Sequence, residues 1–359
     1  MRRLNLAFGS AVIACLFAAV VLFAAACNGP SFDDTQQPVP LLPIASSTPV
    51  PDPDASGVSA TDPIPCPLWP ADNIWNKRVD ALPTHVLSDA YVETMGADDE
   101  LHNGFGSRMW QGKSIGNAYR VVPTAQPLVE VTFTDYADMS EPGPYPYPTN
   151  AIVQGATYRT PVPASGDRHV SVLRAGDCTL FETWHARPNS DGSWSAANGA
   201  VFHLKSNALR PDGWTSGDAA GFAILPALLR YDEVEAGEVT HAIRVTGVMD
   251  SISDTYVWPA RHSDGTSTST HAPPMGTRFR LKADVDISGF SPNMRTILQG
   301  LKTYGMFLAD SGDSWQIGGT PDQRWDDNDA QELRRIVGSD FEAVDESGLM
   351  VDPDSGKSR

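Results

Sequence analysis

The sequence predicts a mainly β protein, an antiparallel, jelly-roll-like β-sandwich with two or three peripheral helices in its C-terminal half. Two observations support this prediction. Short stretches of alternating apolar and polar residues recur from residue 128 onward, and such alternation is typical of strands with one buried face. The 359 residues also include 30 glycines and 29 prolines, which favours many short elements over long helices.

The first 27 residues predict an export signal. Two arginines precede an uncharged, largely apolar run from Ala7 to Ala26, which ends at Cys27. Small residues before a cysteine resemble the lipobox of bacterial lipoproteins, so we expect 1–27 to be a lipoprotein signal peptide and Cys27 to carry lipid. An ordinary cleaved signal peptide and an uncleaved membrane anchor are the alternatives. With the lipid, the protein would sit on the extracellular face of the bacterial cell membrane.

Composition divides the rest of the chain. Residues 28–65 are dominated by Pro, Ser, Thr and Asp without hydrophobic periodicity, which predicts a disordered tether. Residues 66–350 would form a single large β domain, and 351–359 a disordered tail. Of the four cysteines, only Cys66 and Cys178 fall in the domain, and such a pair in an exported protein favours a disulfide. A nucleophilic Cys178 is the alternative, but no basic residue adjoins it to lower its pKa.

The predicted strands follow one another along the domain. Residues 128–136 alternate, and 169–174 with 178–184 predict a hairpin whose turn is Ala175-Gly176-Asp177. Further alternating stretches are 200–206, 239–246, 254–260 and 278–287.

Three helices are expected, all late in the chain. The first spans 226–237, between Pro226 and Gly237. The second spans 291–305, with Ser291 as N-cap and an apolar stripe on one face. The third runs from about 327 to 338, and its acidic first turn suits a helix N-terminus.

Several motifs between residues 69 and 350 are similar to those of a large group of secreted proteins from actinobacteria and other soil bacteria. They include ADNIWN, EPGPYPYP, GAVFHLKSNALRPDGWTSGDAAG, PPMGTRFRLKA and LKTYGMFLADSGDSW. The resemblance implies an exported bacterial protein. It assigns no activity, cofactor or catalytic residue, so the site predictions rest on the chemistry of individual side chains.

The net charge and the spacing of the histidines exclude several classes of partner and cofactor. With 26 Lys and Arg against 44 Asp and Glu, the net charge is −18, which argues against a nucleic-acid partner and against binding anionic lipid through a basic patch. The membrane contact would be made by the N-terminal lipid alone. The histidines lack the helical spacing of a zinc site, so we expect no cofactor. Acidic loop clusters such as Asp310-x-x-Asp313 allow a structural calcium.

A polar sheet face is the predicted ligand site. Alternation places Asp167, His169 and Ser171 on one side of their strand, and sends His203 and Lys205 outward from another. If the strands are neighbours, these side chains share one face. An ordinary solvated face is the alternative. His241, on an apolar face, is expected to be a hydrogen-bonded core residue, with a perturbed acid/base group as the alternative.

The predicted chemistry is cleavage of polysaccharide or cell-wall glycan, by a glycoside hydrolase or a polysaccharide lyase. Glu182 and Asp232 are the candidate acid and base, because glycosidic cleavage needs two carboxyl groups, and His169 and His262 are further candidates. The predicted substrate-binding residues are Asp167, His203, Lys205, Trp214 and Arg261, partly on loops 207–221 and 261–276. The alternative function is a non-catalytic module that binds carbohydrate or peptidoglycan.

Overall fold

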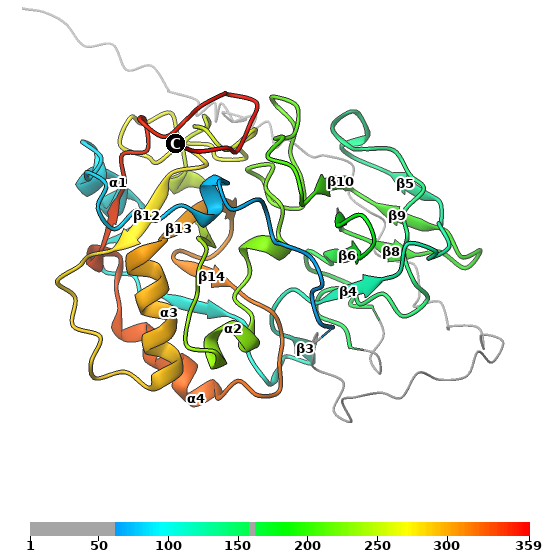
Figure 1. Cartoon of the computed structure of the whole chain (residues 1–359), viewed down its shortest axis with the longest axis horizontal. Helices are drawn as coiled ribbons and strands as arrows, with labels where there is room; N and C mark the ends of the chain where they lie inside the picture. The colour runs from blue at the N-terminus through cyan, green and yellow to red at the C-terminus, as the bar shows by residue number, and fades with distance from the viewer. Residues whose placement is uncertain (1–61, 158–161) are drawn as a thin grey trace, which may run out of the picture. The chain divides into compact units, whose positions relative to one another are not determined.

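The computed structural model describes residues 62–157 and 162–359 (Figure 1), all within one compact unit spanning Pro40–Arg359. The predicted signal peptide 1–27, with Cys27, and most of the predicted tether 28–65 lie outside the described residues. The last tether residues already belong to the domain. Asp62 Oδ2 accepts a hydrogen bond from the Val121 backbone at 3.0 Å, and the Tyr119 hydroxyl donates to the Asp62 carbonyl at 2.8 Å. The ordered domain therefore begins before residue 66.

The protein is mainly β, as predicted, with fifteen strands in four sheets among the described residues. The largest sheet has six strands. In spatial order they are β1 (His102–Gly104), β14 (Gln316–Gly318), β11 (Ile243–Gly247), β13 (Met306–Ser311), β12 (Arg278–Leu281) and β15 (Phe341–Ala343). The pairs β1–β14 and β11–β13 are parallel, so this sheet is mixed and not purely antiparallel as expected.

The strands of a four-stranded sheet lie between β1 and β11 in the chain. Its order is β10 (Asn198–His203), β7 (Thr179–Trp184), β6 (Val170–Arg174) and β4 (Tyr119–Val122), with β4 parallel to β6. The predicted hairpin is confirmed as β6 and β7. A three-stranded sheet contains β5 (Val131–Phe133), β9 (Trp194–Ala196) and β8 (Arg187–Pro188), and a short hairpin contains β2 (Met109–Trp110) and β3 (Lys113–Ser114).

The four-stranded sheet is covered on both faces. Leu173, Leu180 and Phe202 on one face belong to the larger hydrophobic core. Val172 and Phe181 on the other face belong to a second core, which includes residues of the three-stranded sheet. Strands buried on both faces leave no solvated side for a ligand.

Four α-helices occur among the described residues: α1 (Ser88–Gly96), α2 (Tyr231–Glu235), α3 (Pro292–Thr303) and α4 (Asp327–Ala330). The helix predicted at 291–305 is confirmed as α3, which packs against β12 (Figure 1). The other two predicted helices are shorter, because 3-10 turns occupy Leu225–Ala227 and Gln331–Arg335. The remaining 3-10 turns are Ile74–Asn76, Ala137–Met139, Met249–Ser251 and Gly338–Asp340.

Two long-range connections close the domain. The predicted disulfide is confirmed between Cys66 and Cys178, which are 112 residues apart in the sequence. Residues 351–359, predicted to be a disordered tail, instead pack against the early part of the domain, where the Ser358 backbone donates to the Asp72 carbonyl at 2.9 Å. None of the helices in the described ranges is long and apolar enough to cross a bilayer.

Candidate functional site

A buried arginine on a central strand marks the candidate site. Arg244 lies in β11, and Asp310 lies near the end of β13, its parallel neighbour. The register of the two strands shifts after Val245, so that Thr246 pairs with Asp310 and Ala309 is skipped. An irregularity of this kind re-aims side chains, and here it places Asp310 on the Arg244 face.

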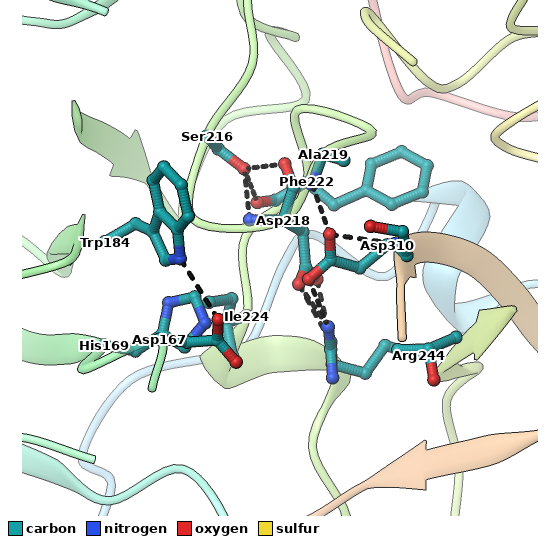
Figure 2. A network of polar contacts seen from close by, with 12 residues as sticks. Asp167, His169, Trp184, Ser216, Asp218, Ala219, Phe222, Ile224, Arg244 and Asp310 are labelled. Carbon is teal, nitrogen blue, oxygen red and sulfur yellow. Dashed lines mark hydrogen bonds and ion pairs between the residues drawn. The ribbon is translucent and has the colours of Figure 1, made fainter. Parts of the chain in front are cut away.

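Arg244 binds two carboxyl groups (Figure 2). Its Nε donates to both oxygens of Asp218, at 3.0 and 2.9 Å, and its Nη2 donates to Asp310 Oδ2 at 3.2 Å. The Asp218 side chain is 0% exposed, whereas that of Asp310 is 21% exposed. Backbone N–H groups of Ala219 and Ser311 donate to Asp310 Oδ1 at 3.2 and 3.0 Å. Asp310 is therefore the carboxyl group of this trio that solvent can reach.

The side chains of Arg244, Asp218 and Asp310 form a trio with one basic and two acidic groups. Burial alone would lower the pKa of Arg244, but Asp218 and Asp310 outweigh it and raise this pKa, so the guanidinium stays charged. Burial and the nearby Asp218 raise the pKa of Asp310 well above its ordinary value, although Arg244 opposes the shift. One guanidinium therefore binds two carboxyl groups, and the raised pKa of Asp310 favours its protonated form.

Two loops meet beside Asp310. The backbone of Arg261 donates to the Ala220 carbonyl at 2.8 Å, and His262 Nδ1 lies 2.8 Å from the Ala219 carbonyl. Loops 207–221 and 261–276 therefore lie together, with His262 and Asp310 both bonded to Ala219. Nearby, Asp264 Oδ2 accepts a hydrogen bond from the Ser311 hydroxyl at 2.5 Å. The buried Asp264 Oδ1 has no hydrogen-bond partner among the described residues.

Glu182 is fully enclosed. Its carboxyl oxygens accept hydrogen bonds from the backbones of Ile224 and Leu225, at 2.8 and 3.0 Å, and from the Ser171 hydroxyl at 2.9 Å. Burial raises the pKa of Glu182 to about 7, and these three donors together oppose the shift without cancelling it. Such a group anchors the 222–228 segment to the sheet. It has no open surface through which to meet a polymer.

His169 is also buried, at 4% exposure. Its Nδ1 has no hydrogen-bond partner among the described residues. Burial lowers the pKa of His169 to about 4, against the opposing charges of Asp167 and Asp218. The imidazole is therefore neutral at neutral pH, and it lies near enough to Asp218 and Arg244 for their charges to affect its pKa.

An aromatic patch, consisting of Tyr136, Trp184 and His185, lies at the surface near His169. The rings of Trp184 and His185 stack with centroids 4.0 Å apart, and Tyr136 lies 6.3 Å from Trp184. Trp184 Nε1 donates to Asp167 at 3.4 Å (Figure 2). His185 and its neighbour Arg168 are non-glycine residues with positive φ, 53° and 49°. Strained backbone of this kind occurs preferentially at functional sites.

The predicted polar sheet face is wrong. Ser171 pairs with Glu182 and both are buried, because the face we took as solvated packs on the larger core. His203 pairs with Thr179 and lies on the opposite face of the sheet, where it is exposed. The alternation was correct, but the sheet has a second covering layer that the sequence did not reveal.

Other predicted residues lie apart from the trio. Lys205 is exposed. Trp214 is half-buried, and the guanidinium carbon of Arg210 lies over its indole, 5.5 Å from the ring centroid. Arg261 is buried, and it donates to the Pro353 carbonyl and to Asp354, both at 2.8 Å. It therefore holds the C-terminal segment.

Asp232 is not a site residue in this structure. It is largely exposed and pairs with Arg324 at 2.7 Å. The adjacent Glu233 turns inward to His241, with oxygens 3.2 and 3.3 Å from Nε2. His241 is thus the hydrogen-bonded core residue that its apolar neighbours predicted.

The sequence interpretation passed over Arg244 and Asp264 as site residues, and it considered Asp310 only as part of an acidic cluster for calcium. A signal for two of them was present, because AIRVTG and MFLADS each place a charge inside an apolar run. Strands that are buried on both faces have nearly continuous apolar sequences. A charged residue within such a sequence needs a buried partner. Asp264 lies in a loop and carried no comparable signal.

Among residues 62–157 and 162–359, no group of three or more His, Cys, Asp or Glu side chains is arranged to hold a metal ion. The acidic Asp326 caps α4, where its side chain accepts a hydrogen bond from the Asn328 backbone at 2.8 Å. Comparisons with family models, curated proteins and solved structures give no match to this chain.

Proposed function

We propose that the protein is an exported enzyme that cleaves polysaccharide or cell-wall glycan, with Asp310 as its general acid. The observation that supports this most directly is the partly exposed Asp310 carboxyl group, whose pKa is raised beside the Asp218–Arg244 pair. A general acid must hold its proton near neutral pH and must be reachable by the leaving oxygen. The raised pKa and partly exposed side chain of Asp310 suit it to this role, whereas Glu182 is enclosed.

The proposed reaction is hydrolysis of a glycosidic bond. Asp310 donates its proton to the glycosidic oxygen as the bond from that oxygen to the anomeric carbon breaks. Water attacks the anomeric carbon, and its proton passes to the Asp264 carboxylate, so that one water is consumed for each new reducing end. Arg244 and Asp218 are positioning residues that set the proton affinity of Asp310. Hydrolysis is favoured over lyase chemistry because His169, the candidate lyase base, is enclosed.

The test is Asp310→Asn, assayed with the purified protein on a panel of polysaccharides by counting new reducing ends. We expect turnover to fall by roughly 100-fold to 10,000-fold, the usual contribution of a general acid, while the melting temperature stays within a few degrees. Asp313→Asn, which changes an exposed carboxylate just after the end of β13, is the matched control and should keep full activity. Turnover unchanged in Asp310→Asn would refute the assignment, and unsaturated uronate products would show lyase chemistry instead.

A non-catalytic glycan-binding module is the second candidate. The aromatic patch supports it, because aromatic rings pack against the apolar faces of sugars and Asp167 fixes the orientation of Trp184. Retention of the protein on an insoluble glycan without new reducing ends would favour this function, provided that the retention is lost in Trp184→Ala.

We also propose that the predicted sandwich corresponds to the four-stranded and three-stranded sheets, because both contribute side chains to the second core.

The proposal places the protein on the outer face of the cell membrane, anchored by lipid on Cys27. Cys27→Ala is expected to move the protein from the detergent phase to the aqueous phase of a detergent partition, or to leave its precursor unprocessed. A single 14-carbon acyl chain binds membranes only marginally, so multiple acylation is expected. An unchanged membrane fraction with the leader still attached would identify the uncleaved anchor instead.

A further inference from the structure

A cavity lies outside the site described above. It has a volume of about 300 Å³ and is lined by His85, Tyr91, Trp258, Arg278, Asp345 and Glu346, together with aliphatic side chains. Small-molecule sites commonly fall between roughly 300 and 1,000 Å³. The cavity is at the lower end of that range, so it suits one ring and not a stretch of polymer.

The aromatic walls are fixed in place. Trp258 Nε1 donates to the Ser355 carbonyl at 2.9 Å, which pins the edge of the indole. Tyr91 and His85 stack with centroids 5.2 Å apart and planes 16° apart. A wall that is already ordered loses little conformational entropy when a ligand binds.

One carboxyl oxygen at this cavity has no protein partner. Glu346 Oε1 accepts from Arg278 Nη1 at 2.8 Å, but no described residue bonds to Oε2, although the side chain is only 9% exposed. Arg278 itself is fully buried and also donates to the carbonyls of Ile74, Lys77 and Tyr304. Its charge therefore holds Glu346 in place and leaves Oε2 free to accept a hydrogen bond.

A hydrogen-bond donor also lines the cavity. His85 Nδ1 accepts from the Leu87 backbone at 3.1 Å, so the proton of the neutral ring is on Nε2. The cavity thus combines aromatic faces with the Glu346 carboxyl acceptor and the His85 imidazole donor, and the Asp345 carboxyl group also lines it. A sugar ring has the matching features, since its C–H faces pack on aromatic rings and each hydroxyl both donates and accepts.

We propose that this cavity binds a single pyranose ring, either as a free monosaccharide or as the terminal residue of a glycan. Its ligand class rests on the proposed function, but the cavity takes no part in the chemistry at Asp310. Glu346 Oε2 would accept from one ring hydroxyl, and His85 Nε2 would donate to another. Trp258 would pack against the apolar face of the ring.

The experiment uses the full chain labelled with 5-fluorotryptophan and follows its fluorine NMR spectrum. The resonance that disappears in Trp258→Phe is that of Trp258. Glucose, galactose, N-acetylglucosamine and glucuronate are then titrated singly, followed by a glycan ending in whichever sugar binds. We expect saturable shifts of the Trp258 resonance with at least one sugar and, on the scale of other binding hot spots, at least about tenfold weaker binding in Glu346→Gln.

Because Glu346→Gln disturbs a buried ion pair, His85→Gln is the second variant and should also weaken binding about tenfold. Trp110→Phe, at a surface hairpin, is the control that keeps native affinity. Asp310→Asn should bind the sugar normally, so loss of turnover and loss of this site are distinguishable. No shift with any sugar, or an equal response in His85→Gln and the native chain, would overturn the proposal. A shift caused only by an alkylammonium such as tetramethylammonium would overturn the ligand class.

Discussion

Arg244→Met is expected to destabilise the domain by about 3–5 kcal/mol, the usual cost of breaking a buried ion pair by removing one partner. Asp218 would remain in the core with no cation, and its side chain is 0% exposed. Its two hydrogen bonds to Arg244 Nε would be lost together. Neutralising the carboxyl group or exposing it to water would each require free energy. Urea unfolding at neutral pH measures the change.

Two variants isolate the cause of this loss. The double variant Asp218→Asn with Arg244→Met removes both charges and should recover part of the lost stability, because a buried pair replaced as a unit is far less costly. Arg78→Met breaks a surface pair with Asp80 and should change stability little. A double variant no more stable than Arg244→Met alone would show that packing around the guanidinium, and not its charge, holds the site together.

Glu182 and His169 are expected to have opposite effects on the pH dependence of stability. The pKa of Glu182 is raised from 4.5 to about 7, so its favourable contribution is complete below 4.5 and is lost as pH rises through 7. The pKa of His169 is lowered from 6.5 to about 4, so its favourable contribution is complete above 6.5 and is lost as pH falls through 4. At about 1.4 kcal/mol per pH unit, each amounts to roughly 3 kcal/mol.

Between about pH 4.5 and 6.5 the two contributions should cancel. The folded protein holds Glu182 protonated and His169 neutral, while the unfolded chain holds the first ionised and the second protonated, so the bound protons are equal in number. His169→Gln should therefore lose roughly 3 kcal/mol as pH rises from about 4.5 to 7, and Glu182→Gln a similar amount as pH falls from about 6.5 to 4.

Urea unfolding across this pH range, taken as the difference between each variant and the native chain, is the measurement. His203→Gln, which changes an exposed histidine on β10, is the matched control and should follow the native curve. Parallel curves for His169→Gln and the native chain would contradict the burial of His169 as a neutral ring.

Features that depend on local sequence were predictable. The β6–β7 hairpin followed from alternation on both sides of a short turn, and α3 from Ser291, Pro292 and an apolar stripe. The Cys66–Cys178 bond followed from there being only two cysteines in the domain. The short helix α1 was missed, because its nine residues carry no cap and only a weak apolar stripe.

Features that depend on which layers pack together were not predictable. Alternation shows that Ser171 and Val172 face opposite ways, but not that a hydrophobic core lies on each side. Glu182 and His169 were therefore placed at a surface that does not exist. The same limit applies to Arg244 and Asp310, which are 66 residues apart and meet through a parallel pairing and a register shift.

The position of the four-stranded sheet between two cores bears on how the protein can be divided. On β7, Leu180 is a side chain of one core and Phe181, the next residue, is a side chain of the other. Any cut that separates the cores must leave this strand with one fragment, whose bare face would then expose apolar side chains to water. Dividing the protein between the cores would therefore uncover apolar surface, because both cores depend on the same strand.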